Sequence, residues 1–398
     1  MSCVSVKNGL DHSIMRVVGL LSGTSIDGID VAVAELTVSG DEIRLVPLGH
    51  SELPYPRDLR EELLATLPPA AATVEAVTRL DTRVGQAFAE AAATMSDGAD
   101  LVASLGQTVF HWVEDGRARG SLQLGQPAWI AERTGLPVVA DLRVRDIAAG
   151  GHGAPLASTL DALWLRDLAP AVALNIGGIA NVTVVRADGV QAYDTGPGNA
   201  LLDLAAHEVT GGAQSSDLDG AIAARGRVHP ELLERLLAEP YYAAPPPKST
   251  GKELFHADYL RAATAGLDVG DEDLLATLTE LTAVTIARAC AGATTVIASG
   301  GGAENPVLMR ALATHLPGTR LAVSDDFGLP RAAKEAYLTA LLGWLTWHGI
   351  PASLPAATGA RGARLLGSIT PGAGPLTPPA PHPVPVTRLR VAAHTDHR

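Results

Sequence analysis

The sequence has few of the residues that build disulfide frameworks, basic binding surfaces or membrane spans. Cys3 and Cys290 are its only cysteines, too few for a disulfide framework or a cysteine-built zinc site, so a reducing cytoplasm is the expected compartment. Lys and Arg number 30 against 43 Asp and Glu, which gives a formal net charge of −13. Because no basic field attracts phosphate backbones or anionic lipids, we expect no nucleic-acid or membrane partner. The longest apolar helical stretch, residues 336–345, is too short to cross a bilayer.

The two commonest nucleotide-binding patterns are also missing. There is no G-x-x-x-x-G-K-[ST] loop, and no G-x-G-x-x-G lies between a strand pattern and a helix pattern with an acidic residue about 20 residues further on. Common mononucleotide- and dinucleotide-binding folds are therefore disfavoured. The remaining common arrangement holds a nucleotide between two lobes, each of which contributes one phosphate-binding hairpin.

Two segments of the chain share one design. An apolar run at 17–21 leads through S-G-T-S-I-D-G into an alternating strand at 29–36, and a second run at 171–176 leads through Gly177 and Gly178 into further β-branched residues. With 398 residues and 47% hydrophobic content, the chain can fill two cores. The sequence therefore predicts two related α/β halves.

The first glycine-rich turn has the composition of a polyphosphate site. Glycine lets backbone N–H groups approach an anion, and Thr24 and Ser25 add hydroxyl donors. Asp27 or Asp30 is suited to hold Mg²⁺ through the water shell that this ion keeps. A plain hairpin explains this motif alone equally well, and the paired second hairpin favours phosphate binding. The glycine cluster at 299–302 is expected on the nucleoside side.

Two acidic residues are candidates for catalysis. Asp194, in D-T-G-P-G-N, stands before a turn that opens a helix, where a carboxylate can orient and deprotonate a hydroxyl or water. On the motif alone, a helix cap is the commoner role for such an Asp. Glu335 lies opposite the apolar stripe of its predicted helix and therefore faces either solvent or a cleft.

Two further segments are candidates for substrate binding. The segment 141–156 places Asp141, Arg143, Arg145 and Asp146 beside four glycines, which favours a ligand loop, with a surface ion-pair cluster as the alternative. Gln107, Thr108 and His111 follow the apolar run 101–103, at the strand end where open α/β sheets bind ligands, although a lone His is more often structural. The Pro-rich connection 240–255 exceeds an ordinary loop and is a further candidate functional segment.

Taken in order, these motifs resemble the series found in anhydro-N-acetylmuramic acid kinases. The resemblance runs from about residue 17 to 360 and rests on segments 21–30, 105–111, 141–156, 175–183, 194–199, 248–255, 299–309, 327–337 and 350–360. Each piece is weak by itself, whereas the ordered set is specific. One departure is Ser104–Leu105, where the family usually has a Gly-His pair.

The resemblance implies a reaction and a set of residues. Such an enzyme opens the 1,6-anhydro bridge of anhydro-N-acetylmuramic acid with water and phosphorylates O6 from ATP with Mg²⁺, in peptidoglycan recycling. Asp194 matches the base that activates water, and Glu335 an acidic residue near the sugar. The expected ATP contacts are Gly23, Thr24, Ser25, Ile26, Asp27, Gly28, Ile29, Asp30, Gly177, Gly178, Gly300, Gly301 and Gly302. The expected sugar contacts are Gln107, Thr108, His111, Asp141 and Arg143.

The fold implied is two ribonuclease H-like α/β lobes of the actin/hexokinase type, with nucleotide and sugar in the cleft between them. We expect an N-terminal lobe at 14–140, a C-terminal lobe at 141–371 whose last segment can return to the first lobe, and a Pro-rich disordered tail at 372–398. The resemblance also suggests a homodimer. Alternatives are a kinase of the same fold for another sugar or a carboxylic acid, and a non-catalytic ATP-binding regulator.

Overall fold

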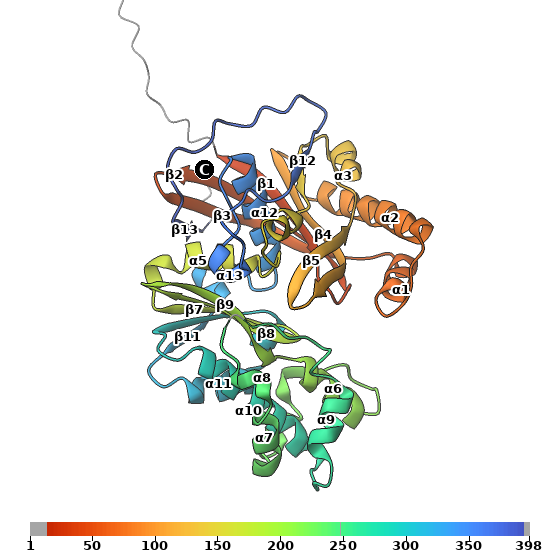
Figure 1. The fold of residues 1–398 in the computed structure, drawn as a ribbon, viewed down its shortest axis with the longest axis vertical. Helices are drawn as coiled ribbons and strands as arrows, with labels where there is room; N and C mark the ends of the chain where they lie inside the picture. Colours follow the sequence, from red (N-terminus) through yellow and green to blue (C-terminus); the bar gives the residue numbers. More distant parts are fainter. Residues whose placement is uncertain (1–13, 247, 394–398) are drawn as a thin grey trace, which may run out of the picture.

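The computed structural model describes residues 14–246 and 248–393, which form two α/β lobes (Figure 1). The first lobe is the upper one in Figure 1, and the second lies below it. Within the described residues, no helix combines the length and apolarity needed to cross a membrane. The division at residue 140 stays a prediction, because the chain crosses between lobes more than once.

The first sheet begins with an antiparallel meander of three strands and continues with two parallel ones. Its central order is β3-β2-β1-β4-β6, with β4 parallel to β1 and to β6. These strands are β1 (Met15–Ser22), β2 (Gly28–Ser39), β3 (Glu42–Pro54), β4 (Leu101–Glu114) and β6 (Val138–Ala140). A further strand, β5 (Arg117–Leu124), forms a hairpin with the outer part of β4.

The second sheet repeats this arrangement. Its order is β9-β8-β7-β10-β11, again a three-stranded meander followed by two parallel strands. The strands are β7 (Ala171–Ile176), β8 (Ile179–Arg186), β9 (Gly189–Pro197), β10 (Thr295–Ser299) and β11 (Arg320–Val323). The repeated order confirms the prediction of two related α/β halves, and each glycine-rich turn joins the first two strands of its sheet.

Helices cover both sheets. The residue pattern predicts a helix at 74–93 and another at 200–209, and the structure has α2 and α6 there. The first lobe contains α1 (Arg57–Thr66), α2 (Val74–Ala93) and α3 (Pro127–Thr134). The second contains α6 (Ala200–Val209), α7 (Pro230–Leu237), α8 (Pro240–Ala243), α9 (Ala257–Thr264), α10 (Asp271–Ala289) and α11 (Pro306–His315). Two more helices, α4 (Val144–Ala148) and α5 (Ala157–Trp164), lie in the chain between β6 of the first sheet and β7 of the second.

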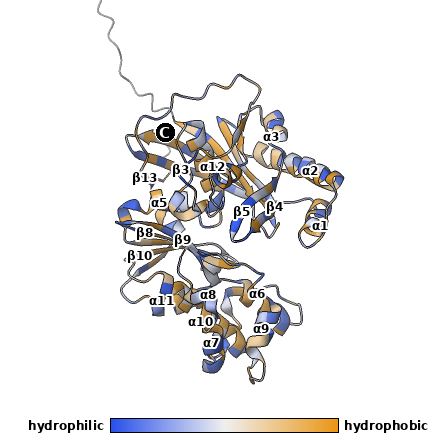
Figure 2. Ribbon diagram, viewed as in Figure 1, coloured by the Kyte–Doolittle hydropathy of each residue, from blue (hydrophilic) through white to orange (hydrophobic). Residues whose placement is uncertain are grey.

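The helix α12 (Lys334–Trp347) returns from the second lobe to lie against β1 and β4 of the first sheet (Figure 1). Two glycines allow this contact. A Cβ at Gly19 would lie 2.0 Å from the Ala336 carbonyl oxygen, and one at Gly343 would lie 2.4 Å from the Ala103 Cβ. Residues 336–346 of α12 are all buried, and Figure 2 shows the apolar colour of this helix. At these two glycines, the backbone of α12 therefore lies almost directly on the sheet.

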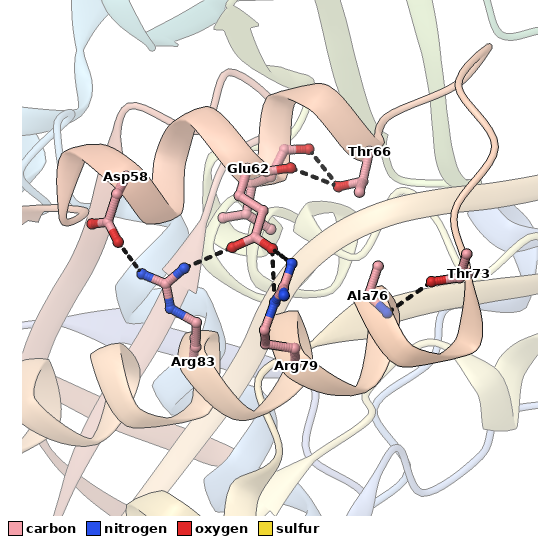
Figure 3. A network of polar contacts seen from close by, with 8 residues as sticks. Asp58, Glu62, Thr66, Thr73, Ala76, Arg79 and Arg83 are labelled. Carbon is pink, nitrogen blue, oxygen red and sulfur yellow. Dashed lines mark hydrogen bonds and ion pairs between the residues drawn. The ribbon is translucent and has the colours of Figure 1, made fainter.

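The opposite face of the first sheet is covered by α1 and α2, which an ion-pair network joins (Figure 3). Glu62 of α1 accepts hydrogen bonds from Arg79 and Arg83 of α2, and Arg83 also pairs with Asp58. Thr73 caps α2 by accepting a hydrogen bond of 3.1 Å from the Ala76 N–H. The network fixes α1, which carries Arg60, beside the first glycine-rich turn.

The Pro-rich tail returns to the first sheet, so its predicted disorder is wrong for part of its length. After β12 (Ser368–Thr370) pairs with β6 at one edge, β13 (Arg388–Val391) pairs in parallel with β3 at the other. Arg388 binds the Asp41 carboxylate at 2.7 Å. An unpaired β3 edge would expose a row of N–H and C=O groups, and β13 satisfies them. Residues 394–398 of the predicted tail lie outside the described residues.

We predict that Gly19→Ala destabilises the first lobe by about 1–3 kcal/mol, because the added methyl must push α12 away from β1. Equilibrium unfolding in urea would measure the change. Gly374→Ala is the matched control, since a Cβ there meets open space and the residue has no positive φ. Equal stability of the two variants would show that α12 does not pack this closely on the strand.

Candidate active site

A cavity of about 250 Å³ lies between the lobes and is lined by residues of both. Four of the residues that the sequence predicted line it: Asp30 and Glu335 from the first lobe, and Gly300 and Gly301 from the second. Its other walls include Asn175 at the end of β7 and the α5 residue Asp161. Asp194, by contrast, is not among the described residues that line this cavity.

The first glycine-rich turn is held in an unusual backbone conformation. Ile26 is fully buried and has a φ of 56°, which is strained for a β-branched residue. Its N–H donates to the Gly23 carbonyl at 3.1 Å, and its own carbonyl accepts a 2.7 Å bond from Arg60 Nε. Arg60 also pairs with Asp27 at 3.2 Å. The tip residues Thr24 and Ser25 remain exposed, as a ligand-binding turn requires.

Gln107, predicted to bind sugar, is completely buried beneath this turn. Its Nε2 donates to the Gly23 carbonyl at 3.1 Å, and its Oε1 accepts a hydrogen bond from the Tyr55 hydroxyl at 3.2 Å. Ser22 supports the same turn by donating to the Gly28 carbonyl at 2.7 Å. Gln107 thus positions the first hairpin, and a sugar contact by it stays a prediction.

The second glycine-rich turn binds the segment that starts α6. The Gly178 carbonyl accepts hydrogen bonds from the N–H groups of Gly198 and Ala200, and the Gly177 carbonyl accepts one from Asn199, all at 2.8–2.9 Å. The position of Asp194 before a helix start predicts free N–H donors beside it, and this prediction is wrong because these N–H groups are used within the lobe. Because the N-cap of α6 is Asn199, Asp194 does not cap this helix, and the alternative role considered for it is wrong.

The late glycine cluster packs on the end of β7. Gly300 has a φ of 81°, and a Cβ on it would lie 2.5 Å from the Asn175 Oδ1. A Cβ on Gly302 would lie 2.3 Å from a methyl carbon of Ile176. The turn at 177–178, the glycines at 196–198 and the cluster at 300–302 therefore meet around the end of β7. Glycine allows the backbone segments to approach this closely.

Asp194 is held by hydrogen bonds from the connection 240–255, the segment predicted to be functional. Its carboxylate accepts hydrogen bonds from the Ser249 hydroxyl at 2.9 Å and the Thr250 N–H at 3.0 Å. Burial raises the pKa of Asp194, and the nearby Glu253 adds to this, while the two hydrogen bonds oppose it. A carboxylate with a raised pKa is a stronger base, which is the property that water activation needs.

Asp30 and Glu335 share the interlobe cavity and repel each other. Burial raises the pKa of Asp30 to about 7, and the charges of Glu52 and Glu335 contribute. Glu335 is exposed to the cavity in the first turn of α12, where the helix dipole favours a negative charge. Of its two predicted settings, solvent or a cleft, the structure places Glu335 in a cleft.

Arg143 interacts electrostatically with two other predicted residues, Glu335 and His111. Arg143 donates to the Gly153 carbonyl at 2.8 Å, and among the described residues its buried Nε has no hydrogen-bond partner. Burial lowers the pKa of Arg143, and the charge of Glu335 opposes this. The pKa of His111 is lowered by burial and by the charges of Arg143 and His152. Arg143 is therefore close enough to feel the charge of Glu335, and His111 is close enough to feel the charge of Arg143.

The remaining predicted residues of these two segments have other surroundings. Thr108 accepts a hydrogen bond from Gln123 at 3.3 Å, and Asp141 is exposed with a φ of 58°. Asp146, considered as part of a surface cluster, is fully buried and accepts bonds from Thr358 and from the Gly153 N–H. It fixes the loop 141–156, whereas sugar contacts by Thr108 and Asp141 stay predictions.

One buried ion pair in the cavity wall was not predicted. Lys334 lies 2.7 Å from Asp161 of α5, and both side chains are at most 9% exposed. Asp161 also accepts a 2.9 Å hydrogen bond from Thr183 of β8, so the contacts run from α12 to the second sheet. A lysine beside a glutamate on a helix usually indicates a solvated face, and nothing in the sequence signalled this burial.

The resemblance stated from the sequence implies ATP with a divalent cation, and the cavity has partial means to hold such a cation. Burial is the main cause of the raised Asp30 pKa, and a cation near Asp30 and Glu335 would relieve the repulsion between the two carboxylates that adds to it. In the described part of the chain, no three His, Cys, Asp or Glu side chains are grouped to hold a metal directly. The residues thus fit Mg²⁺ held mainly by water and phosphate.

We predict that Asp30→Asn makes the protein more stable than the parent chain at neutral pH. Between about pH 4 and 7, the Asp30 carboxyl is protonated to a greater extent in the folded protein than in the unfolded chain. The free energy of unfolding therefore falls as the pH rises through this window, and Asp30 causes no further change above it. The variant lacks this loss, and its advantage should reach about 1–2 kcal/mol, since solvent screens part of the effect. Urea unfolding at several pH values tests this, and a pH-independent difference would contradict it.

Solved structures with a similar chain path are distant in sequence. The xylulose kinase of Rhodospirillum rubrum is 15% identical, with 83% of this chain and 89% of that chain covered at a TM-score of 0.44. The gluconate kinase of Lactobacillus acidophilus is 9% identical, with coverage of 84% and 89% at a TM-score of 0.43. Similarity at this level carries no conclusion about substrate.

Sequence comparison gives a far closer relationship. The pattern that defines the family "Anhydro-N-acetylmuramic acid kinase" matches residues 15–372. Proteins with this name from Streptomyces avermitilis and Streptomyces coelicolor are 60% and 57% identical, over 90% and 95% of this chain and 95% and 99% of their own lengths. One from Rhodococcus erythropolis is 52% identical, over 90% of this chain and 94% of its own. The cavity lined by Asp30, Glu335, Gly300 and Gly301 is thus found in a chain that belongs to the anhydro-N-acetylmuramic acid kinase family.

Proposed function

We propose that this protein uses ATP to hydrolyse the 1,6-anhydro bridge of 1,6-anhydro-N-acetylmuramic acid and to phosphorylate O6, giving N-acetylmuramic acid 6-phosphate and ADP. The observation that carries the proposal is the interlobe cavity, which combines the acidic pair Asp30 and Glu335 with Gly300 and Gly301 of the late glycine cluster. The 60% identity to a relative of that name supports the choice of sugar.

ATP would bind with its phosphates between the two glycine-rich turns. In this proposal, residues 23–30 contact the phosphates from the first lobe, Gly177 and Gly178 contact them from the second, and 300–302 contact the nucleoside. The exposed Thr24 and Ser25 hydroxyls support this placement. Mg²⁺, when bound, would neutralise phosphate charge, and Asp30 is the residue best placed to order its waters. Asp27 is a weaker candidate because Arg60 already pairs with it.

The chemistry needs one base and two displacement steps, one at the anomeric carbon and one at the γ-phosphorus. Asp194 takes a proton from water as the water oxygen attacks the anomeric carbon, and the bond from that carbon to O6 breaks. The freed O6 then attacks the γ-phosphorus, and the bond to the leaving ADP oxygen breaks. Ser249 and Thr250 orient Asp194 for the first step. Glu335 and Arg143 would orient the sugar near the transferred phosphoryl group.

We further propose that the protein works in the cytoplasm, as a homodimer, on a small-molecule sugar. The two cysteines of the chain, of which Cys290 is free and buried, are compatible with a reducing compartment. An assay of purified protein with ATP, Mg²⁺ and the anhydro sugar tests the proposed reaction. Formation of the 6-phosphate is the expected result, and absence of any phosphorylated sugar would overturn it.

We predict that Asp194→Asn lowers kcat by about 100-fold or more, because a general base contributes roughly 10²–10⁴ to rate. The ATP dissociation constant should change less than about twofold, since Asp194 does not line the nucleotide cavity. Asp188→Asn, in the exposed turn between β8 and β9, is the matched control and should retain full activity. Substantial turnover by Asp194→Asn would remove its role as the base.

A further inference from the structure

A second, larger cavity of about 780 Å³ adjoins the sugar side of the site. Residues 116–120 of the β4–β5 hairpin line it, as do Val144, Ile147 and Ala148 of α4. His152, Gly359 and Arg361 complete the lining. None of the residues described as lining it is acidic. In a chain with a net charge of −13, a cavity with three arginines and a histidine is a strong local reversal of sign.

Arg361 is built into this cavity rather than lying loosely at its edge. Its backbone N–H donates to the Ala149 carbonyl at 3.0 Å, and its Nη2 donates to the Ala148 carbonyl at 3.3 Å. Gly150 has a φ of 90°, and a Cβ there would lie 2.9 Å from the Arg361 Nη1. The glycine therefore leaves the space that the guanidinium occupies.

The other cations face the cavity from β5. Arg119 contacts Glu114 at 3.4 Å, with both side chains about half exposed, an arrangement that contributes little to stability and leaves the guanidinium available. Arg117 lies beside the turn on the same strand. Val144 and Ile147 of α4 add an apolar surface between these charges. The cavity thus offers several cations and one apolar wall.

This cavity shares a wall with the proposed sugar site. His152 lines it and lies one residue before Gly153, whose carbonyl accepts the hydrogen bond from Arg143. His111 pairs with Ser121 on β5, next to the cavity residue Gly120. A substituent on a sugar held near Arg143 and His111 would therefore lie close to residues that line this cavity.

We propose that this cavity binds an acidic peptide attached to the carboxyl group of the sugar acid, so that the enzyme also accepts peptide-bearing anhydro sugars. The inference rests on the proposed function. A single carboxylate would leave most of 780 Å³ empty, whereas ligand pockets of roughly 300–1,000 Å³ hold extended molecules. The arginines would bind the peptide carboxylates, and Val144 and Ile147 would contact its apolar part.

The test compares binding of two conjugates of the anhydro sugar acid, one with an alanyl-glutamate dipeptide and one with the same dipeptide as its uncharged diamide. Calorimetry should show the acidic conjugate binding about tenfold more tightly or better. Arg361→Ala and the double variant Arg117→Ala/Arg119→Ala should each abolish most of that preference and leave diamide binding within about twofold. Arg310→Ala, an exposed arginine on α11, is the matched control.

Turnover of the conjugates gives a second readout. The proposal expects phosphorylation of the acidic conjugate, with the arginine variants raising KM for it and leaving kcat unchanged. Equal affinity for the two conjugates, or equal loss in Arg310→Ala, would overturn the proposal. Displacement of the acidic conjugate by equimolar inorganic phosphate would assign the cavity to free anions and overturn it too. Arginine-dependent binding without phosphorylation of any sugar would support the peptide site and overturn the proposed function.

Discussion

The contact between α12 and β1 is the constraint on which the rest of the site depends. Because Gly19 has no side chain, the backbone of α12 lies directly on the strand that leads into the first glycine-rich turn. The start of the helix is thereby fixed at the interlobe cavity, with Glu335 beside Asp30 and Lys334 paired with Asp161. A helix that packed through ordinary side chains would stand further away and separate these groups.

The second lobe reaches a similar result with different contacts. There the glycines let backbone segments approach one another, so that the turn at 177–178, the start of α6 and the cluster at 300–302 meet around β7. Asp194 is held apart from this assembly by Ser249 and Thr250. Its carboxylate is therefore oriented by a loop and not by a helix or strand. Catalytic residues are often positioned in this way.

Much of the architecture could be predicted from the sequence, because it is encoded locally. The paired glycine turns, the helix at 74–93 and the motif order all come from short-range patterns. Four features were not predictable, since they depend on partners far away in the chain. These are the burial of Lys334, the burial of Gln107, the pairing of β13 with β3, and the use of the N–H groups at 198–200 by the second turn.

The central claim is that one enzyme couples cleavage of the anhydro bridge by water to phosphorylation of O6. The most direct measurement is the position of oxygen in a product formed in ¹⁸O-labelled water with ATP and 1,6-anhydro-N-acetylmuramic acid. We predict one labelled oxygen on the anomeric carbon and an unlabelled oxygen bridging C6 to phosphorus, confirmed by fragment masses recorded before the anomeric oxygen exchanges. A label in the bridging oxygen, or a 6-phosphate absent from the products, would contradict the coupled reaction.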